Sequence, residues 1–295
     1  MNAPLPVPLP DSTVWLNGAW TPLAEARVPV LDRGFIFGDG VYEVVPVYGR
    51  VPFRWAEHLA RLQRSLGRLR IDNPMPPEDW TRLVSELVAR HPWDDQFVYL
   101  QVTRGVAKRD HAFPVGITPT VFAMTSPLPA LPAAQIEQGV SAVTLPDERW
   151  LHCDIKSISL LGNVLAKQAA VEAGAAEGVM FRDDYLTEGS SANIWVVREG
   201  RVIAPPRNRL ILEGIRYGLL EQLCEAEGVP FEVRPVPRAE VLSADELMLS
   251  SATKEVLAIT RLDGQPVGQG VPGPVFRKLH AAYQRAKTAS TAAGR

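Results

Sequence analysis

Apolar residues in the first half of the chain recur with the periods of both strands and helices. Val14–Leu16 and Ala19-Trp20 flank Asn17-Gly18, a dipeptide that favours the type I′ turn of a β-hairpin because both of its residues tolerate positive φ. Leucines at positions 59, 62, 66 and 69 follow helical spacing within a charged segment, which predicts an amphipathic helix. A second helix is expected to begin near Pro77, because proline fits the first helical turn. Strands are expected at Val41–Tyr48, Phe97–Thr103 and Thr120–Met124.

The second half of the chain mixes the same two kinds of segment. A proline-rich stretch, Thr125–Ala134, has neither period and separates the halves. Helices are expected at Leu160–Gly174 and Leu212–Gly228 and from Val275 onward. Strands are expected at Val140–Leu145, Leu151–Lys156, Gly178–Arg182, Ala192–Val197, Val202–Ala204, Phe231–Val236 and Leu247–Ser251. These elements predict an α/β fold of the mixed α+β kind. We expect an N-terminal domain at residues 1–128, with a disordered tail at 1–11, a linker at 129–134 and a C-terminal domain at 135–295.

The composition is that of a globular protein without an obvious polyanionic partner. The 295 residues carry 31 Lys+Arg and 33 Asp+Glu, so the formal net charge of −2 removes the main argument for binding nucleic acid or an anionic membrane. No apolar run reaches the roughly 18–20 residues of a membrane helix, and the proline-rich N-terminus lacks the basic segment of a signal peptide. Cys153 and Cys224 form neither a disulfide framework nor a metal-ligand cluster, so both are expected to be reduced, buried thiols. We therefore expect a cytoplasmic protein without a metal site.

Lys156 is one of only six lysines and the first candidate nucleophile. If Leu151–Lys156 forms a strand, alternation places Leu151, Cys153 and Ile155 on one face and His152, Asp154 and Lys156 on the other. An amine among apolar neighbours loses hydration, which lowers its pKa and allows it to form a Schiff base with a carbonyl substrate or pyridoxal phosphate. The alternative is an edge lysine paired with Asp154, because most lysines lie at protein surfaces.

Three further segments could bind a ligand, and each also has a purely structural explanation. The run from Glu188 to Asn193, which reads EGSSAN, is either a polar turn or a carboxylate placed to hold a cationic ring nitrogen. Gly214-Ile215 at a helix start and Ser250–Thr253 after a strand could cradle a phosphate, although hydroxyl residues are common at strand ends. Lys108-Arg109-Asp110-His111 is either a solvated charged loop or a grip for a carboxylate.

Five motifs, in this order along the chain, resemble those of one enzyme family. The chain from about Trp15 to the terminal helix resembles the class IV aminotransferases, which are the fold-type IV pyridoxal-phosphate enzymes. Within that family the motifs are most similar to those of bacterial D-amino acid aminotransferases. The resemblance implies a two-domain fold with pyridoxal 5′-phosphate held between the domains. The motifs are DRGFIFGDGVYEVV at Asp32–Val45, EHLAR at Glu57–Arg61, QVTRG at Gln101–Gly105, DIKS at Asp154–Ser157 and EGSSAN at Glu188–Asn193.

The resemblance implies how the cofactor is held and used. Lys156 would form the Schiff base with pyridoxal phosphate and then move the proton between the substrate Cα and the cofactor C4′. Glu188 would pair with the pyridinium nitrogen and keep it protonated, and Arg61 would bind the phosphate. The other residues implied to contact the cofactor, several through backbone amides of the phosphate cradle, are Ser191, Leu212, Gly214, Ile215, Ser251 and Ala252.

The resemblance also implies how the substrate is recognised. Tyr42, Arg109 and His111 occupy the positions that trap the α-carboxylate in D-amino acid aminotransferases, and Val44 lies on the same strand as Tyr42. In that family the Arg and His come from the neighbouring subunit, which implies a homodimer. Its D-specific and L-specific members protonate the same face of C4′, so the carboxylate trap decides how the substrate is turned.

Three positions depart from the family pattern. Arg216-Tyr217 stands where Thr-Arg often follows Gly-Ile, and Ala204 stands where Thr is usual. Both departures would alter hydroxyl contacts to the phosphate, and Arg216 either adds a phosphate contact or lies on the surface. Trp195, in place of Phe or Tyr, is interpreted as a packing change.

The predicted activity is transamination between a D-amino acid, such as D-alanine, and a 2-oxo acid, such as 2-oxoglutarate. The predicted enzyme is a cytoplasmic homodimer that acts on small molecules and binds neither nucleic acid nor membrane. Alternatives of the same fold are a branched-chain L-amino acid aminotransferase, an (R)-amine transaminase and an aminodeoxychorismate lyase. A non-catalytic pyridoxal-phosphate or metabolite-binding protein is the alternative from another class. The presence of both Lys156 and Glu188 argues against it.

Overall fold

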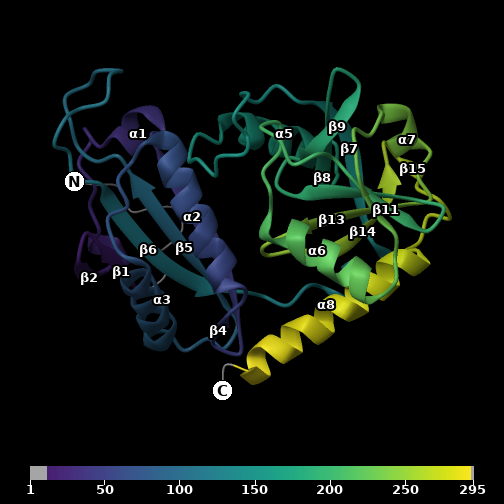
Figure 1. Ribbon diagram of the computed structural model, residues 1–295, viewed down its shortest axis with the longest axis horizontal. Coiled ribbons are helices and arrows are strands. Elements are labelled where there is room, and N and C mark those ends of the chain that lie inside the picture. The colour runs from purple at the N-terminus through teal and green to yellow at the C-terminus, as the bar shows by residue number, and fades with distance from the viewer. Residues whose placement is uncertain (1–11, 294–295) are drawn as a thin grey trace. The chain divides into compact units, whose positions relative to one another are not determined.

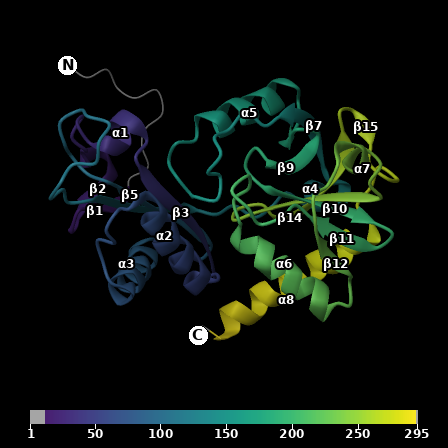
Figure 2. The ribbon, with the colours of Figure 1, turned by 45° about the horizontal axis from the view of Figure 1, so that its top comes forward.

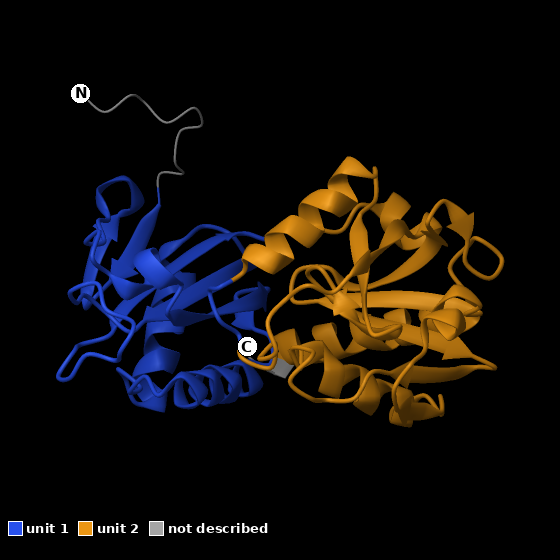
Figure 3. Cartoon of the chain, turned by 90° about the horizontal axis from the view of Figure 1, so that it is seen from above, with its two compact units in different colours: residues 1–129, 156–159 blue, residues 130–155, 160–295 orange. Residues whose placement is uncertain are grey.

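The computed structural model describes residues 12–293, which form two compact units (Figure 3). Unit 1 contains the chain up to residue 129 together with residues 156–159, and unit 2 contains residues 130–155 and 160 onward. The four residues 156–159 therefore belong to unit 1 although unit 2 contributes the chain on both sides of them. The expected disordered tail at 1–11 lies outside the described residues.

Unit 1 is an antiparallel sheet with helices packed on it (Figure 1). Its six strands lie in the order β2-β1-β6-β5-β3-β4. Helix α2 packs on β3, and α3 packs against β1, β5 and β6. The elements are β1 (Thr13–Leu16), β2 (Ala19–Pro22), a 3₁₀ turn (Leu23–Glu25), α1 (Arg33–Phe37), β3 (Gly40–Tyr48), β4 (Val51–Pro52), α2 (Trp55–Leu69), α3 (Pro77–Arg90), β5 (Gln96–Thr103) and β6 (Thr120–Pro127).

The local signals in unit 1 are confirmed. Asn17 and Gly18 both have positive φ, 48° and 94°, as the type I′ hairpin turn requires. Helix α2 buries Leu62 and Leu66 at the expected helical spacing. Its buried face also carries three polar residues with the same period, His58, Arg61 and Ser65, which the leucine pattern alone does not indicate.

Unit 2 is built on a larger mixed sheet. Its strands follow the order β12-β11-β10-β13-β14-β7-β8-β9, and β15 pairs with β14 beside this path. The pairs β11·β12, β14·β7 and β7·β8 are parallel, and the other pairs are antiparallel. The strands are β7 (Val140–Pro146), β8 (Glu177–Arg182), β9 (Tyr185–Gly189), β10 (Asn193–Arg198), β11 (Arg201–Ala204), β12 (Phe231–Val233), β13 (Glu246–Ser251), β14 (Glu255–Leu262) and β15 (Gln265–Pro266).

Helices cover this sheet. Helix α5 packs on β7 and β8, while α6 and α8 lie side by side against β13 (Figure 2). The helices of unit 2 are α4 (Ala133–Gln138), α5 (Leu161–Glu172), α6 (Ile215–Ala226), α7 (Arg238–Leu242) and α8 (Pro274–Ala293). The described part of the chain contains no helix that is both long and apolar enough to span a membrane. The mixed α/β class predicted from the sequence is confirmed in both units.

Two sequence expectations in unit 2 are wrong. Leu151–Lys156 is not a strand but a series of turns. The backbone N–H of Ile155 donates to the carbonyl of His152, and that of Cys153 donates to the carbonyl of Arg209. Cys153 and Ile155 are buried, as the alternation predicts, but Leu151, expected on the same face, is 48% exposed. The helix expected from Leu212 begins at Ile215, because Gly214, in an extended conformation, is its N-cap.

Candidate active site

The backbone of Lys156 lies beside strand β3. The N–H of Tyr42 donates to the carbonyl of Lys156 at 3.0 Å, and the N–H of Ile158 donates to the carbonyl of Gly40 at 3.1 Å. The Lys156 N–H in turn donates to Ser65 Oγ on α2 at 3.3 Å. The Lys156 ammonium lies 4.0 Å from the centroid of the Tyr42 ring, a distance at which a cation is attracted to the ring face. Lys156 and Tyr42, two residues singled out in the sequence, are therefore brought together.

Tyr42 and Val44 share the half-buried face of β3, and Glu43 points to the other face. Tyr42 packs beside Tyr99 of β5, with ring centroids 5.8 Å apart. Burial, with a smaller contribution from the charge of Tyr42, raises the pKa of Tyr99 to about 12. Tyr99 Oη is therefore a hydrogen-bond donor at neutral pH, and it donates to Gln101 Oε1 at 2.7 Å.

Arg61 is anchored by a buried carboxylate on the opposite face of β3. Its Nε and Nη2 donate to the two carboxylate oxygens of Glu43 at 2.7 and 2.8 Å. His58 Nδ1 lies 2.7 Å from Glu43 Oε2. Burial pushes the pKa of Glu43 upward, but the charge and hydrogen bonds of Arg61 and His58 outweigh it and hold that pKa well below its usual range. Glu43 and His58, which the sequence analysis did not single out, thus fix the Arg61 guanidinium, whose predicted contact with a phosphate stays a prediction.

Arg109 and His111 are exposed on the loop of residues 104–119, which connects β5 to β6. Both side chains lie on the ring of Phe37 in α1. The His111 ring centroid is 5.4 Å from it and the Arg109 guanidinium carbon 5.5 Å. The two predicted carboxylate-binding residues therefore contact the same aromatic ring.

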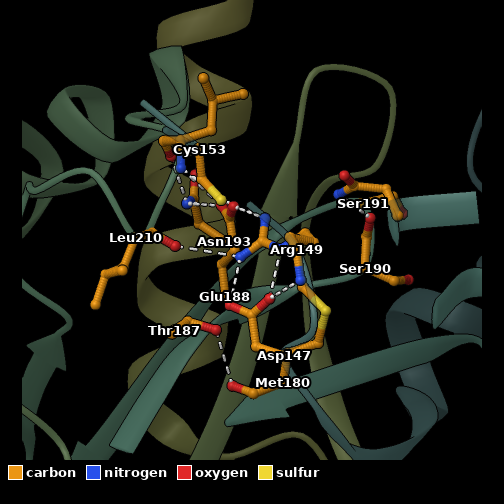
Figure 4. A network of polar contacts seen from close by, with 12 residues as sticks. Asp147, Arg149, Cys153, Met180, Thr187, Glu188, Ser190, Ser191, Asn193 and Leu210 are labelled. Atoms are coloured by element: carbon orange, nitrogen blue, oxygen red, sulfur yellow. Dashed lines mark hydrogen bonds and ion pairs between the residues drawn. The ribbon is translucent and has the colours of Figure 1, made fainter. Parts of the chain in front are cut away.

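Glu188 is the centre of a buried polar network in unit 2 (Figure 4). Its carboxylate forms a close ion pair with Arg149. It also accepts hydrogen bonds from the N–H of Leu212 at 3.1 Å and from the side-chain amide of Asn193 at 3.2 Å. Arg149 also forms two bonds of 2.9 Å to Asp147. Glu188 lies in β9, and Ser190–Ala192 form the turn into β10, so the carboxylate projects from a strand rather than from the turn itself.

The two carboxylates that share Arg149 differ in their tendency to ionise. Asp147 is also paired with Arg182 at 3.1 Å. Burial raises the pKa of Asp147, but hydrogen bonds and charge from Arg149 outweigh it and the pKa is lowered overall. At Glu188 burial prevails over the charge and hydrogen bonds of Arg149, and the pKa rises to about 7. A further positive charge at Glu188 would therefore be stabilised there.

The residues of the predicted phosphate cradle lie at the start of α6 and at the end of β13. Gly214 makes no side-chain cap, so the first N–H groups of this 12-residue helix have no capping side chain. Arg216 is buried, and its guanidinium donates to the carbonyl of Ala252 and to Tyr283 Oη, each at 3.2 Å. The surface alternative for Arg216 is therefore wrong, and Arg216 joins the α6 start to the Ala252 turn.

The other two departures from the family pattern, Trp195 and Ala204, are both buried. Trp195 is fully buried, and its Nε1 donates to Ser250 Oγ at 3.0 Å. Its ring centroid lies 4.8 Å from that of Tyr217, which supports the interpretation of a packing change. Ala204 is fully buried at the end of β11.

A buried carboxylate that the sequence analysis missed joins two of the predicted cofactor-binding turns. Glu177, at the start of β8, accepts bonds from the hydroxyls of Ser190 and Ser191, the latter at 2.8 Å. It is also paired with Lys254 Nζ at 2.9 Å. Lys254 follows Ser251 and Ala252, and its N–H donates to Ser251 Oγ at 3.1 Å. Burial raises the pKa of Glu177, but the charge of Lys254 and the serine hydroxyls outweigh it and lower that pKa overall.

Neither cysteine thiol is a reactive nucleophile at neutral pH. Cys153 and Cys224 are both free and buried, as expected. Burial raises the pKa of Cys153 to about 11 and that of Cys224 to about 12, so both are protonated at neutral pH. The only nucleophile candidate from the sequence that the described geometry places beside other site residues is therefore Lys156.

Comparison with known proteins gives a consistent result. Residues 40–262 match the model of the family named amino-transferase class IV. The D-alanine aminotransferase of Bacillus licheniformis is 42% identical over 279 residues, which cover 95% of this chain and 98% of that protein. The D-alanine aminotransferase of Staphylococcus aureus (strain COL) is 38% identical over 273 residues, 92% of this chain and 96% of that protein.

Solved structures show the same fold. The branched-chain amino acid aminotransferase of Escherichia coli superposes with a TM-score of 0.89 at 23% identity, covering 93% of this chain and 94% of that one. The branched-chain aminotransferase of the thermophilic archaeon Thermoproteus uzoniensis, solved with norvaline, superposes with a TM-score of 0.84 at 26% identity, covering 93% of this chain and 94% of that one.

Proposed function

The chain belongs to the class IV aminotransferases, and we propose that it transfers the amino group of a D-amino acid, such as D-alanine, to a 2-oxo acid, such as 2-oxoglutarate. Pyridoxal 5′-phosphate would be its cofactor. The observation that carries this choice of substrate is the similarity to D-alanine aminotransferases along 95% of the chain. The paired Arg109 and His111 on the Phe37 ring are consistent with it, because a guanidinium and an imidazole together suit a carboxylate.

The residues of unit 2 fit the two charged ends of that cofactor. Glu188 is a buried carboxylate that would gain from a further cation, which a protonated ring nitrogen provides. Helix α6 begins at Gly214 without a side-chain cap, and the start of such a helix suits a phosphate. Ser251 and Ala252 lie in the turn that Arg216 joins to this helix start. The cofactor would supply an electron sink for the bond-breaking at the substrate Cα.

The chain itself supplies the amine and the proton transfer. Lys156 Nζ would hold the cofactor covalently, and after release it would take the proton from the substrate Cα and return it at C4′. The backbone bonds to Tyr42 and Ser65 hold the Lys156 main chain, so that Nζ moves only by rotation of its own side chain. The Tyr42 ring at 4.0 Å would keep the amine oriented when it is protonated.

A homodimer forms part of the proposal, with Arg109 and His111 of one subunit acting in the site of the other. Helix α5 supports it, because Leu161, Val164 and Leu165 share one helical face and are 71%, 57% and 62% exposed. Contiguous exposed apolar residues of this kind are typical of surfaces that another chain covers. A cytoplasmic location, and the absence of a nucleic-acid or membrane partner, remain predictions from the sequence.

The alternative function is that of a branched-chain L-amino acid aminotransferase, which the solved structures of the same fold favour. An (R)-amine transaminase is a further possibility of the fold. A half-reaction separates them. The purified, cofactor-loaded protein is mixed with D-alanine, L-alanine or L-leucine without a 2-oxo acid, and the absorption band of the lysine-bound cofactor is followed.

Rapid loss of the band with D-alanine, and not with either L-amino acid, is the expected result. Loss with L-leucine alone would move the protein to the branched-chain enzymes and would leave Arg109 and His111 without a role. A band that responds to no amino donor would favour a non-catalytic binding protein.

A further inference from the structure

One buried arginine holds the backbone of the 104–119 loop. Arg33, at the start of α1, is 3% exposed. Its Nη1 donates to the carbonyl of Asp110 at 2.6 Å and to that of Ala112 at 3.4 Å, and its Nη2 donates to that of His111 at 3.4 Å. A guanidinium is planar and its donors have fixed directions, so three consecutive carbonyls can meet it in few loop conformations. Arg33 therefore restrains the loop backbone at residues 110–112.

The same short helix also supports the side chains of that loop. Phe37 lies one turn after Arg33 on α1, and the Arg33 guanidinium carbon is 4.8 Å from its ring centroid. The other contacts of this ring are with His111 and Arg109. Backbone and side chains of the loop thus rest on one rigid element, which Asp32 caps through a 2.8 Å bond from the Gly34 N–H.

Asp39 fixes the arginine in turn. Its Oδ2 accepts from Arg33 Nε at 2.8 Å and from Arg104 Nε at 2.7 Å. Arg104 donates to the carbonyls of Leu69 and Arg70, at the end of α2, at 2.8 and 3.0 Å. The anchor of the 104–119 loop is therefore connected through charged hydrogen bonds to the main helix of unit 1.

We propose that Arg33 is a positioning residue for substrate recognition, because it holds Arg109 and His111 where both can donate to the same α-carboxylate. This inference rests on the proposed function, in which Arg109 and His111 bind that group. A displacement of about 1 Å in a substrate-positioning group can cost about 100-fold in catalytic efficiency (kcat/KM), so a pair of donors needs such an anchor. Arg33 would thus determine selectivity for amino acids over amines that lack a carboxylate.

The test is the variant Arg33→Lys in the cofactor-loaded enzyme. Lysine keeps the positive charge beside Asp39, but its compact ammonium cannot reproduce the fork that meets three carbonyls. We expect the KM for D-alanine to rise by about 10- to 100-fold while kcat changes little, because the loop is misplaced and the reacting groups are not. The cofactor absorption band and the melting temperature report whether the fold is intact.

Two further variants complete the experiment. Arg50→Lys is the matched control, because Arg50 of unit 1 also donates to three carbonyls, those of Val88, Ala89 and His91 at the C-terminal end of α3, where no predicted site residue lies. Its KM should remain that of the wild type. Phe37→Leu removes the ring beneath the loop side chains and leaves the Arg33 bonds, so it should raise the KM even if Arg33→Lys fails to fold.

Arg109→Ala separates failure of this inference from failure of the proposed function. A raised KM in Arg109→Ala, with unchanged KM in Arg33→Lys and Phe37→Leu, would overturn the positioning role alone. An unchanged KM in all three would show that the loop does not bind the carboxylate at all. A loss of kcat at constant KM in Arg33→Lys would also overturn the inference, since it would indicate disturbance of the reacting groups.

Discussion

Glu188 gives the sharpest test of the electrostatics of this site. Burial raises the pKa of its carboxyl from 4.5 to about 7, against the charge and hydrogen bonds of Arg149. A carboxyl whose pKa is higher in the folded protein binds its proton more tightly when folded. Its contribution to stability is therefore complete below about pH 4.5 and is lost as the pH rises to about 7. The two pKa values differ by about 2.5, which at roughly 1.4 kcal/mol per pH unit corresponds to about 3 kcal/mol.

The assay compares the free energy of unfolding of the cofactor-free wild type and Glu188→Gln, measured by urea denaturation at a fixed protein concentration. Glutamine does not titrate, so the difference between the two proteins isolates Glu188 from every other ionising group. Relative to the variant, the wild type should lose about 3 kcal/mol between about pH 4.5 and about pH 7.5 and nothing further above that. Loading the wild type with cofactor should reduce this dependence of the unfolding free energy on pH, because a cation beside Glu188 favours its ionised form.

A difference that stays constant with pH would refute the reasoning. It would show that Arg149 compensates the Glu188 charge fully, and that the carboxylate has no need of a second cation. If the wild type instead became more stable than Glu188→Gln as the pH rises, the pKa of Glu188 would be lowered in the folded protein rather than raised.

Three other substitutions test the remaining parts of the site. Lys156→Ala should abolish the absorption band of the lysine-bound cofactor and nearly all turnover, and a normal band in that variant would exclude the assignment of Lys156. Arg109→Ala should weaken D-alanine binding by about 2–5 kcal/mol, measured in the half-reaction, since it removes one partner of a carboxylate pair. Lys254→Met removes a charged hydrogen bond to Glu177, worth about 1.5 kcal/mol, and should raise the dissociation constant of the cofactor roughly tenfold. Lys287→Met, which breaks an ion pair of similar length in the same unit, should leave it unchanged in the same fluorescence titration.

The elements with a strong local period could be predicted, and those whose pattern depends on distant neighbours could not. The β1–β2 hairpin and α2 follow from one turn signal and one helical stripe. Strand β14 was missed, because it is buried on both faces between β13 and β7 and shows a continuous apolar run without alternation. The segment 151–156 alternates in sequence but forms turns, because its backbone groups bond to Arg209, to Tyr42 and within the segment.

The site residues came from family resemblance more than from local pattern. Arg149 was not singled out, because Asp147-Glu148-Arg149 looks like a solvated charge run, and only the folded sheet buries it beside Glu188. Glu177 was missed because a single glutamate at the start of the β8 segment gives no local signal, and only the folded sheet buries it beside Ser190, Ser191 and Lys254. A signal was available for His58 and Arg61, because they share the helical period of the buried leucines of α2. Polar residues that fall on an apolar helical face are therefore worth examining as candidate site residues.

The segment 156–159 also has a consequence for how unit 1 is completed during synthesis. It pairs with Gly40–Tyr42, on the side of β3 opposite to β5, and so covers main-chain groups that would otherwise form an open sheet edge. Those residues emerge from the ribosome only after residues 130–155 of unit 2. A nascent chain, or a fragment cut after residue 129, would carry an uncovered edge able to pair with other chains. The segment that carries the proposed nucleophile, Lys156, would then also protect the first sheet from aggregation.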